Sequence, residues 1–281
     1  GFRLDVANEL PDAFIEKIRA AVKRVSPEKF LLGEVWEDAT TKYGFGHRRT
    51  YLLGKGLDSV MNYPFKNAVL DFVKGKPAEQ AMTEILTICE HYPAPAMDTA
   101  LNFLSTHDTE RALTVIADEP ANGRGRAWQS GRCVTGDAYE EGLLRLRMAY
   151  AIIYTLPGVP CLYYGDEIAM QGYRDPFNRA FFRWDAHEQR LRPVLAQLAQ
   201  LRHTCEAFRT GELRVLRAEG GVLHYQRIGE FEAAEIIVNR TEHIIVETLA
   251  SGKSTEVNPM GFTIVVEEVG HNPDHSYYDY V

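Results

Sequence analysis

The first nine residues of the chain, Gly1–Glu9, read GFRLDVANE. Apolar residues occupy every second position of this stretch, which is typical of a strand with one buried face, and the alternation places Arg3 and Asp5 together on the other side. Burying an isolated carboxylate costs free energy, whereas a neighbouring guanidinium can hold the carboxylate ionised. The pair is therefore either a structural salt bridge or part of a site, and this stretch alone favours the salt bridge.

Residues 1–210 alternate short apolar runs with longer segments of helical period, which predicts strand and helix units around a parallel sheet. The expected strands are 2–7, 30–35, 59–63, 100–105 and 159–164. The expected helices are 11–25, 65–74, 78–91, 140–156 and 188–209. Five such strands make an open sheet or most of a barrel.

Residues 211–281 have a different pattern, in which short strands are separated by Gly, Asn, Ser and Thr. The expected strands are 213–216, 222–227, 233–239, 243–249 and 262–269. This pattern predicts a small antiparallel sandwich. The polar and aromatic tail HNPDHSYYDY, residues 271–280, is expected to be loosely held.

The composition is that of an ordinary globular protein, with 281 residues, 45% hydrophobic and 25% charged. The net charge of −8 argues against nucleic acid or an acidic membrane surface as a partner. No apolar run approaches the roughly 20 residues that span a bilayer, and the cytoplasm is the expected location. The four cysteines have no metal-binding spacing and are expected to be reduced: Cys89, Cys133, Cys161 and Cys205.

Acidic residues stand at the ends of four of the predicted parallel strands, where loops build the site in such architectures. They are Asp5, Glu34 in LLGEVWED, Asp108 in LNFLSTHDTER, and the pair Asp166 and Glu167 in CLYYGDEIAM. Four acidic strand ends on one face predict an acidic pocket. Such a pocket suits either a divalent metal or glycoside hydrolysis by paired carboxylates.

Sugar chemistry is the better interpretation of this pocket. Metal-dependent hydrolases usually recruit several histidines or paired carboxylates, but only His107 lies near these acids, which whole strands separate. We therefore predict no metal ligands among them. Aromatic residues near the same strand ends could stack on sugar rings: Trp36, Tyr63, Tyr163, Tyr164 and Trp184.

Four segments carry a resemblance to a known family. GFRLDVANE, LLGEVWE, FLSTHDTER and GVPCLYYGDEIAMQG, in this order, resemble signature segments of the alpha-amylase family of glycoside hydrolases, family 13. The resemblance covers about residues 1–185, and the region from Gly211 resembles the family's C-terminal domain. It implies an α/β chain in which residues 1–210 form part of a TIM (β/α)8 barrel, about its fourth to eighth strand and helix units. Residues 211–281 would form the all-β antiparallel sandwich.

The resemblance also implies roles for individual residues. Asp5 would be the nucleophile of a retaining mechanism, with Arg3 keeping it ionised. Glu34 would be the general acid and then the base, about 5 Å from the nucleophile. Asp108 would grip sugar hydroxyls at the transition state, assisted by His107.

Two further segments narrow the substrate class. DVANE and DSVMNYPF resemble the cyclomaltodextrinase, neopullulanase and maltogenic amylase branch, in which Asn8 and Glu9 would flank the leaving group. RDPFNRAFFRW resembles a loop of that branch, in which Asp175 and Arg179 would contact a sugar. Trp36 is also expected among the substrate-binding residues. Short or cyclic alpha-glucans are the expected substrates, with no cofactor required and calcium conceivable only in a longer parent protein.

Structural roles for these residues are the alternatives. Glu34 and Asp108 would serve as helix N-caps, and Asp175 and Arg179 would form an ordinary loop salt bridge. Asp166 and Glu167 are expected to be structural. Thr106 stands where the family usually has Asn, and this departure leaves the following His and Asp in place.

Two other functions compete with the expected one. One is an alpha-1,6-glucosidase or pullulanase of the same family. The other is a carbohydrate-binding or scaffolding protein that kept the fold and lost the chemistry. Because loss of activity normally shows as substitution of the nucleophile or the acid, the presence of Asp5, Glu34 and Asp108 favours an enzyme.

The resemblance further implies that this chain is the C-terminal piece of a longer enzyme, since family members have three barrel strands before the one that carries the nucleophile. Alone, the piece is expected to be inactive. An open barrel exposes two strand edges and apolar faces, which invite pairing. We therefore expect a homo-oligomer, or association with the missing N-terminal half.

Overall fold

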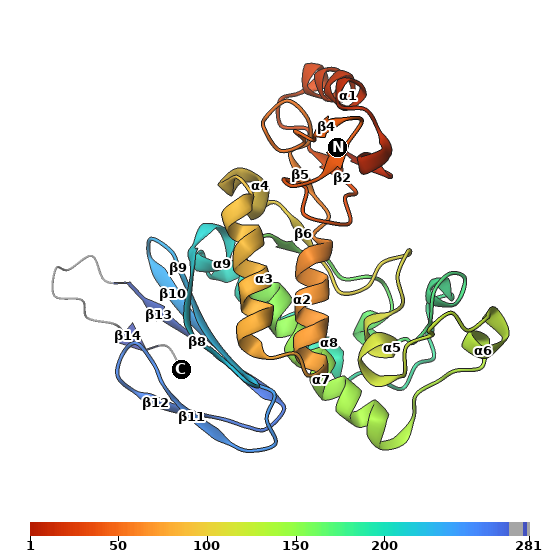
Figure 1. The fold of residues 1–281 in the computed structure, drawn as a ribbon. Helices are drawn as coiled ribbons and strands as arrows, with labels where there is room; N and C mark the ends of the chain where they lie inside the picture. The colour runs from red at the N-terminus through yellow and green to blue at the C-terminus, as the bar shows by residue number, and fades with distance from the viewer. Residues whose placement is uncertain (270–277, 280–281) are drawn as a thin grey trace.

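The computed structural model describes residues 1–269 and 278–279, so that the tail expected to be loose lies almost wholly outside the described residues (Figure 1). Five parallel strands follow one another in chain order. They are β1 (Phe2–Leu4), β2 (Leu31–Gly33), β5 (Ser59–Val60), β6 (Leu101–Asn102) and β7 (Val159–Pro160). Parallel ladders join β1 to β2, β2 to β5 and β6 to β7, and a bridge between Met61 and Leu101 links β5 to β6. The strands form part of a TIM barrel, as predicted.

Helices and turns connect these strands. The helices are α1 (Asp12–Val25), α2 (Tyr63–Lys74), α3 (Ala78–His91), α4 (Ala94–Asp98), α5 (Ala112–Ala117), α6 (Arg126–Ser130), α7 (Gly136–Thr155), α8 (Leu191–Thr204) and α9 (Ala207–Thr210). The 3-10 turns are η1 (Ala7–Glu9), η2 (Asp166–Ile168) and η3 (Phe177–Arg179). A hairpin of β3 (Tyr43–Gly44) and β4 (His47–Arg48) lies between β2 and β5.

Local signals explain where α2 begins and ends. The side chain of Asn62 accepts a hydrogen bond from the backbone of Phe65 and caps the helix, which therefore begins at Tyr63 rather than at the predicted 65. Gly75 ends the helix with φ of 135°, a conformation that favours glycine. The predicted helix 188–209 is instead two helices, α8 and α9. The break follows Cys205, where the backbone amide of Glu206 donates to the Glu232 carboxylate (2.7 Å).

The five parallel strands are only two or three residues long and therefore shorter than predicted. Most of the missing residues lie at their carboxyl ends, and only β2 and β6 also begin one residue later than predicted. After Leu4 the backbone turns at Val6, which has a φ of 41°, and after Gly33 the chain leaves the sheet. The residues counted as strand in the sequence thus form the loops that carry the charged side chains.

The C-terminal part forms an antiparallel sheet of order β14-β13-β10-β9-β8 and a separate two-stranded ribbon. The sheet strands are β8 (Glu212–Glu219), β9 (Val222–Ile228), β10 (Glu232–Asn239), β13 (Gly261–Glu268) and β14 (Tyr278–Asp279). The ribbon strands are β11 (Ile245–Thr248) and β12 (Ser254–Val257), of which β12 was not predicted.

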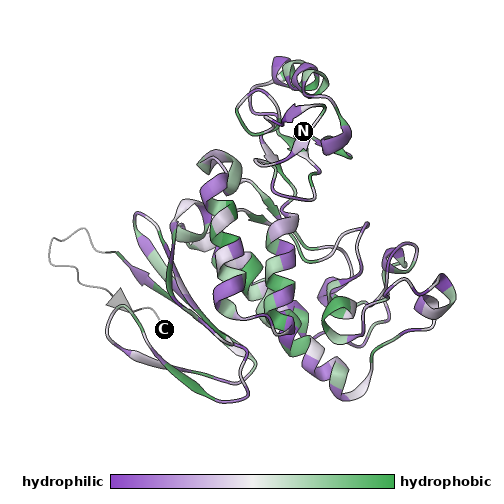
Figure 2. Cartoon of the chain, viewed as in Figure 1, coloured by the Kyte–Doolittle hydropathy of each residue, from purple (hydrophilic) through white to green (hydrophobic). Residues whose placement is uncertain are grey.

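Helix α7 lies at the centre of the core. It packs against α2, α5 and α8 and also against β10 and β13, so that the antiparallel sheet lies on one side of it and α5 on the other (Figure 1). One apolar cluster runs from the barrel helices into β9 and β10, and α2 and α3 carry both hydrophobic and hydrophilic residues (Figure 2). Arg227 of β9 also donates to the Thr155 carbonyl (2.7 Å) at the end of α7. The division at 210/211 stays a prediction, since the core is continuous across it.

None of the described helices is long and apolar enough to cross a membrane. The four cysteines are free thiols. Cys205 is buried and Cys133 is exposed.

Candidate active site

One arginine contacts three of the acidic residues that the sequence singled out. Nη1 of Arg3 pairs with the carboxylate of Asp5, and Nη2 lies 3.1 Å from Glu34 Oε1 and 3.9 Å from Asp108 Oδ2. Arg3 belongs to β1, while the three acids follow the ends of β1, β2 and β6. Because parallel strands end at one edge, residues far apart in sequence meet here. We call Arg3, Asp5, Glu34 and Asp108 the carboxylate site.

Glu34 is held at the bottom of this site, with 3% of its side chain exposed. Its Oε1 accepts a hydrogen bond from Trp36 Nε1 (3.1 Å), and its Oε2 accepts one from the backbone amide of Val6 (2.7 Å). The backbone of Val6 is left-handed, a conformation that is strained for a β-branched residue. Asp5, by contrast, is 73% exposed and lies open to solvent.

Asp108 is oriented by residues on both sides of it. His107 Nε2 lies 2.9 Å from Oδ2, and Arg179 Nη2 lies 3.4 Å from Oδ1. The hydroxyl of Thr106 accepts a hydrogen bond from the Asp108 amide (3.1 Å), so the residue that departs from the family pattern stabilises this turn. The N-cap alternative is wrong for Glu34 and Asp108, since α5 begins only at Ala112 and no helix directly follows Glu34.

The loop that contains η3 reaches back to this turn. Arg179 pairs with Asp175 (3.0 Å), as the salt-bridge alternative proposed, and its Nε also donates to the His107 carbonyl (2.9 Å). The adjacent Asn178 is buried, and its Nδ2 contacts three backbone carbonyls of residues 106–109. Sequence reasoning missed Asn178 because an Asn in a polar loop is an ordinary turn residue and its burial cannot be read from the pattern.

Two of the predicted aromatic residues stack on each other beside Glu34. The rings of Trp36 and Tyr63 have centroids 4.4 Å apart and an interplanar angle of 12°. Tyr63 is buried, which raises the pKa of its hydroxyl, and Trp36 covers its ring. Trp36 itself is 42% exposed, so this ring remains open to a ligand.

The other aromatic residues have different surroundings. Tyr163 and Tyr164 lie against the guanidinium of Arg111, with 4.8 and 4.9 Å between the guanidinium carbon and the ring centroids. Trp184 packs edge-on against Phe182 and is almost fully exposed.

Asn8 and Glu9 lie in η1, beside the carboxylate site. The Asn8 backbone carbonyl accepts a hydrogen bond from Arg49 (2.8 Å), and the Glu9 amide donates to the Val6 carbonyl (2.8 Å). Within the described residues, their side chains do not join the hydrogen bonds of the three carboxylates. The structure therefore places these two residues near the site without bringing them into its network.

Asp166 and Glu167 have the structural environments that were expected for them. Asp166 is buried and lies 3.2 Å from Arg111 Nη1, and Tyr150 donates to its other oxygen (2.6 Å). Burial raises the pKa of Asp166 to about 6, although these partners counteract it. Glu167 accepts a hydrogen bond from the Gly165 amide (2.6 Å).

Comparison with known proteins identifies the family. The family model described as the alpha amylase catalytic domain matches residues 1–207.

The chain belongs to the alpha-amylase family.

Curated proteins and solved structures are similar to this chain. An amylopullulanase of Thermoanaerobacter thermohydrosulfuricus is 33% identical over 81% of this chain and 15% of its own length. A cyclomaltodextrinase of Geobacillus thermopakistaniensis is 33% identical over 86% of this chain and 37% of its own length. The ligand-free cyclic alpha-maltosyl-(1→6)-maltose hydrolase of Arthrobacter globiformis superposes with a TM-score of 0.79 at 25% identity, over 95% of this chain and 55% of that one. The chain thus spans well under half the length of these curated relatives.

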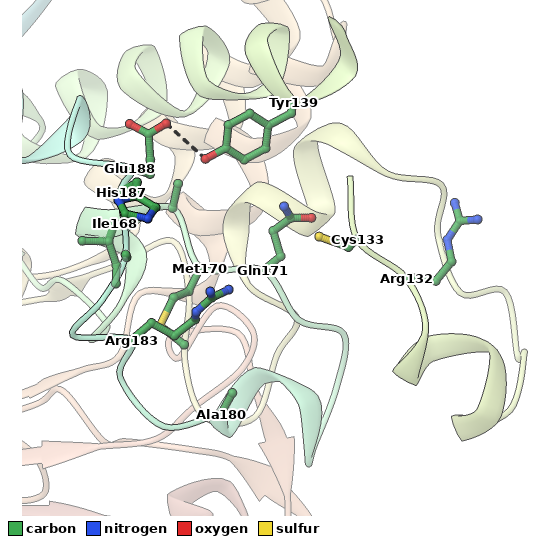
Figure 3. A pocket seen from close by; sticks show the side chains of 12 residues that line it. Arg132, Cys133, Tyr139, Ile168, Met170, Gln171, Ala180, Arg183, His187 and Glu188 are labelled. Carbon is green, nitrogen blue, oxygen red and sulfur yellow. Dashed lines mark hydrogen bonds between the residues drawn. The ribbon is translucent and has the colours of Figure 1, made fainter. Parts of the chain in front are cut away.

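A separate cavity of about 400 Å³ is lined in part by residues that follow η2 and η3, among them Met170 and Ala180 (Figure 3). Tyr139 and Glu188 are hydrogen-bonded at one wall (3.2 Å), and Gln171 holds the backbone of Val134 at another. None of the three carboxylates of the carboxylate site lines this cavity. The cavity is therefore separate from the carboxylate site.

Calcium binding by a longer parent of this alpha-amylase family chain stays a prediction. Among residues 1–269 and 278–279, no group of three or more His, Cys, Asp or Glu side chains is placed to hold a metal ion. The acids of the carboxylate site already have the Arg3 guanidinium as a shared cationic partner. These residues do not fit a calcium site.

Proposed function

We propose that this chain carries the reacting carboxylates of a retaining glycoside hydrolase that cleaves alpha-glucosidic bonds. The observation that carries the proposal is the single guanidinium of Arg3, which contacts Asp5, Glu34 and Asp108. A retaining enzyme needs two carboxyl groups about 5 Å apart on opposite sides of the scissile bond. Two carboxylates on the two terminal nitrogens of one guanidinium are compatible with that spacing.

Asp5 is the proposed nucleophile because its carboxylate is exposed and pairs with its neighbour Arg3. In the first step, an Asp5 oxygen forms a bond to the anomeric carbon as the bond to the leaving oxygen breaks. Glu34 gives its proton to that oxygen. In the second step, Glu34 takes a proton from water, whose oxygen attacks the anomeric carbon and releases the Asp5 carboxylate.

Asp108 and His107 are the proposed binding groups for sugar hydroxyls. Asp108 is partly exposed, and its two oxygens are already oriented by His107 and Arg179. A carboxylate held in this way can strengthen its hydrogen bonds as positive charge develops on the sugar. Trp36, with its open ring next to Glu34, is the proposed stacking surface.

Short or cyclic alpha-glucans are the proposed substrates. Cyclomaltodextrinases, a maltogenic alpha-amylase and a neopullulanase are among the relatives, at 30–34% identity. Amylopullulanases and a hydrolase of a (1→6)-linked cyclic maltosyl-maltose are also among the similar proteins, which supports alpha-1,6 bonds as the second candidate linkage. Comparison of maltotriose, beta-cyclodextrin, pullulan and isomaltose separates the two, since preference for isomaltose would favour the second.

We also propose that the site works in a larger assembly. The relatives are considerably longer than this chain, and apolar side chains stay exposed near the edge strand β1, among them Phe2 and Val6. A second copy of the chain, or the N-terminal half of a family barrel, would cover that edge. Light scattering of the chain alone and with a co-expressed N-terminal half tests this association.

The first test of activity measures reducing sugar released from beta-cyclodextrin and maltotriose. It uses the chain with and without the co-expressed N-terminal half, and Glu34→Gln as the control; we call this the complemented assay. Turnover that requires Glu34 supports the proposal. A folded complex that binds maltotriose without turnover would instead indicate a carbohydrate-binding protein.

A covalent label tests the proposed nucleophile directly. 5-Fluoro-alpha-glucosyl fluoride has a good leaving group and forms a slowly hydrolysed ester with a retaining nucleophile. Mass spectrometry of the digested complex should find the added sugar on the peptide that contains Asp5. An unlabelled peptide in a complex that turns over maltotriose would exclude Asp5 as the nucleophile.

A further inference from the structure

We propose that Asn178 is a positioning residue for Asp108: its side chain fixes the shape of the turn 106–109 and so the direction in which Asp108 points. The importance of this turn for turnover rests on the proposed function. The positioning itself is a property of the folded chain and can be measured without any activity.

The side-chain amide of Asn178 contacts three backbone carbonyls of one turn. Its Nδ2 lies 3.3 Å from the Thr106 oxygen, 2.8 Å from the His107 oxygen and 2.8 Å from the Thr109 oxygen. Asn178 is fully buried, so water does not replace these contacts. Without the amide, carbonyls that now bond to Asn178 would lose a partner inside the protein, which is costly.

The orientation of this amide is fixed by its surroundings. Only the nitrogen of Asn178 can face three carbonyl oxygens, because the amide oxygen is an acceptor and would repel them. That oxygen, Oδ1, is buried and has no hydrogen-bond partner among the described residues. Buried acceptors without a partner are rare and costly, so the three-carbonyl contact outweighs this loss.

The turn that Asn178 holds bears directly on the carboxylate site. It contains Asp108, whose Oδ2 lies 2.9 Å from His107 Nε2 and 3.9 Å from Arg3 Nη2. Arg179 donates to the same His107 carbonyl, so neighbouring residues of η3 grip the turn together. A shift of about 1 Å in a binding group costs roughly 100-fold in rate, so this grip matters for any chemistry at Asp108.

The chain contains a matched control for this residue. Asn239 of β10 is also fully buried, and its Nδ2 likewise faces three carbonyls, those of His243 (2.8 Å), Val257 (3.1 Å) and Asn258 (3.1 Å). Asn239 lies in the antiparallel sheet and has no part in the carboxylate site. Asn→Asp at either position removes the same two N–H donors at almost constant size.

The experiment compares Asn178→Asp and Asn239→Asp in the full 281-residue chain by NMR. The ring 15N and 1H signals of His107, assigned with His107→Gln, report the contact of its Nε2 with Asp108 Oδ2. We expect Asn178→Asp to shift these signals and Asn239→Asp to leave them unchanged, although both lower the melting temperature. Unchanged His107 signals in a folded Asn178→Asp, or equal shifts in both variants, would overturn the proposal.

A second variant and a wild-type measurement guard against a failure to fold. Asn178→Ser keeps one donor and should give a smaller shift of the His107 signals. In the wild-type chain, the Nδ2 protons of Asn178 should exchange with solvent at least about 100-fold more slowly than those of Asn122, which lies in a turn between α5 and α6. Equal exchange rates would contradict a buried Asn178 amide that is hydrogen-bonded to the turn.

The complemented assay then connects position to rate. Asn178→Asp should lower kcat/KM for maltotriose by about 10- to 100-fold, and Asn239→Asp should leave it within about 2-fold. If the wild-type complex has no turnover, the proposed function fails while the NMR comparison still decides the role of Asn178. If turnover is present and Asn178→Asp does not reduce it, the positioning does not serve catalysis.

Discussion

The carboxylate site and a second charged cluster in the antiparallel sheet match their charges in opposite ways. The second, which we call the sheet cluster, consists of Arg217, His224, Glu235 and Glu247. Within it, His224 Nε2 lies 2.9 Å from Glu235 Oε2, and His224 Nδ1 lies 3.3 Å from Glu247 Oε2. Glu247 also pairs with Arg217, so that each carboxylate has a nitrogen partner. In the carboxylate site, three acids share the guanidinium of Arg3, and of these Asp108 also contacts Arg179.

The difference separates charge used for folding from charge available to a ligand. The sheet cluster is largely buried and links β8, β9 and β10 to the ribbon strand β11, which has no backbone ladder to that sheet. Its carboxylates bond to His224, to Arg217 and, for Glu235, also to the Ala250 amide. The carboxylate site has an excess of negative charge and an exposed nucleophile candidate, so its remaining hydrogen-bond capacity faces outward. Substitutions should therefore affect activity at one cluster and stability at the other.

The largest effect is expected for Asp5→Asn in the complemented assay. Removing the nucleophile should lower kcat at least about 1,000-fold, because the covalent step is lost. The free energy of unfolding in urea should change by less than about 0.5 kcal/mol, since the Asp5 side chain is mostly exposed. Glu235→Gln is the control and should leave kcat unchanged. If kcat fell for a fully folded Glu235→Gln variant, the sheet cluster would also serve activity, and the distinction between the two clusters would be wrong.

Arg3→Met should affect both activity and stability. Glu34 would keep its hydrogen bonds from Trp36 and Val6 but lose its cation while buried, which we expect to destabilise the chain by about 1–3 kcal/mol. Turnover should fall about 100-fold, because the three carboxylates lose the shared guanidinium that positions them. Urea unfolding and the complemented assay measure the two effects.

The control for Arg3 is Arg183→Met. Arg183 is exposed and lies 4.0 Å from Asp185, so its removal should cost less than about 0.5 kcal/mol. Equal stability losses in the two variants would show that Arg3 is only a surface charge.

The stability that the sheet cluster contributes should depend on pH. Burial alone raises the pKa of Glu235, but hydrogen bonds from His224 and the Ala250 amide outweigh it and hold this pKa below its usual value. A carboxyl with a lowered pKa in the folded state contributes stability above its unfolded pKa of about 4.3 and loses it as the pH falls through the folded pKa. Glu235→Gln should therefore flatten the acid limb of the stability curve.

The measurement is the urea midpoint of the wild-type chain and of Glu235→Gln between pH 3 and pH 7. At neutral pH the variant should be about 1–2 kcal/mol less stable, because a charge-assisted hydrogen bond is weakened. The difference in the free energy of unfolding between the two proteins should decrease as the pH falls. If this difference in the free energy of unfolding were the same at every pH, Glu235 would not be ionised in the folded protein.

The sequence was sufficient for the order of the five parallel strands and for the meeting of three acidic strand ends at one edge, since apolar alternation and acidic strand ends are local patterns. It was insufficient for the contacts that decide geometry. The role of Asn178 depends on a turn about 70 residues away, and the sheet cluster depends on side-chain contacts between four strands. The end of α8 at Thr204 likewise follows from a contact with Glu232 rather than from any Gly or Pro. Such tertiary contacts leave no periodic signal in sequence.

The smallest effect tests whether strain at the carboxylate site is real. Val6 has a φ of 41°, and the left-handed region costs an ordinary residue about 1–2 kcal/mol. Val6→Gly relieves this strain and keeps the amide that donates to Glu34, while glycine costs about 0.5–1 kcal/mol through the unfolded chain. Because Val6 is 46% exposed, little packing is lost. The variant should thus be as stable as the wild type or up to about 1 kcal/mol more stable.

Val25→Gly provides the matched control, since Val25 is 78% exposed and is the last residue of α1. Glycine there relieves no left-handed strain and should cost about 0.5 kcal/mol. Thermal unfolding of both variants at pH 7 measures the difference. A loss for Val6→Gly as large as that for Val25→Gly would mean that the left-handed turn stores no strain. The position of Glu34 would then depend on its hydrogen bond to the Val6 amide alone, and not on the choice of residue at position 6.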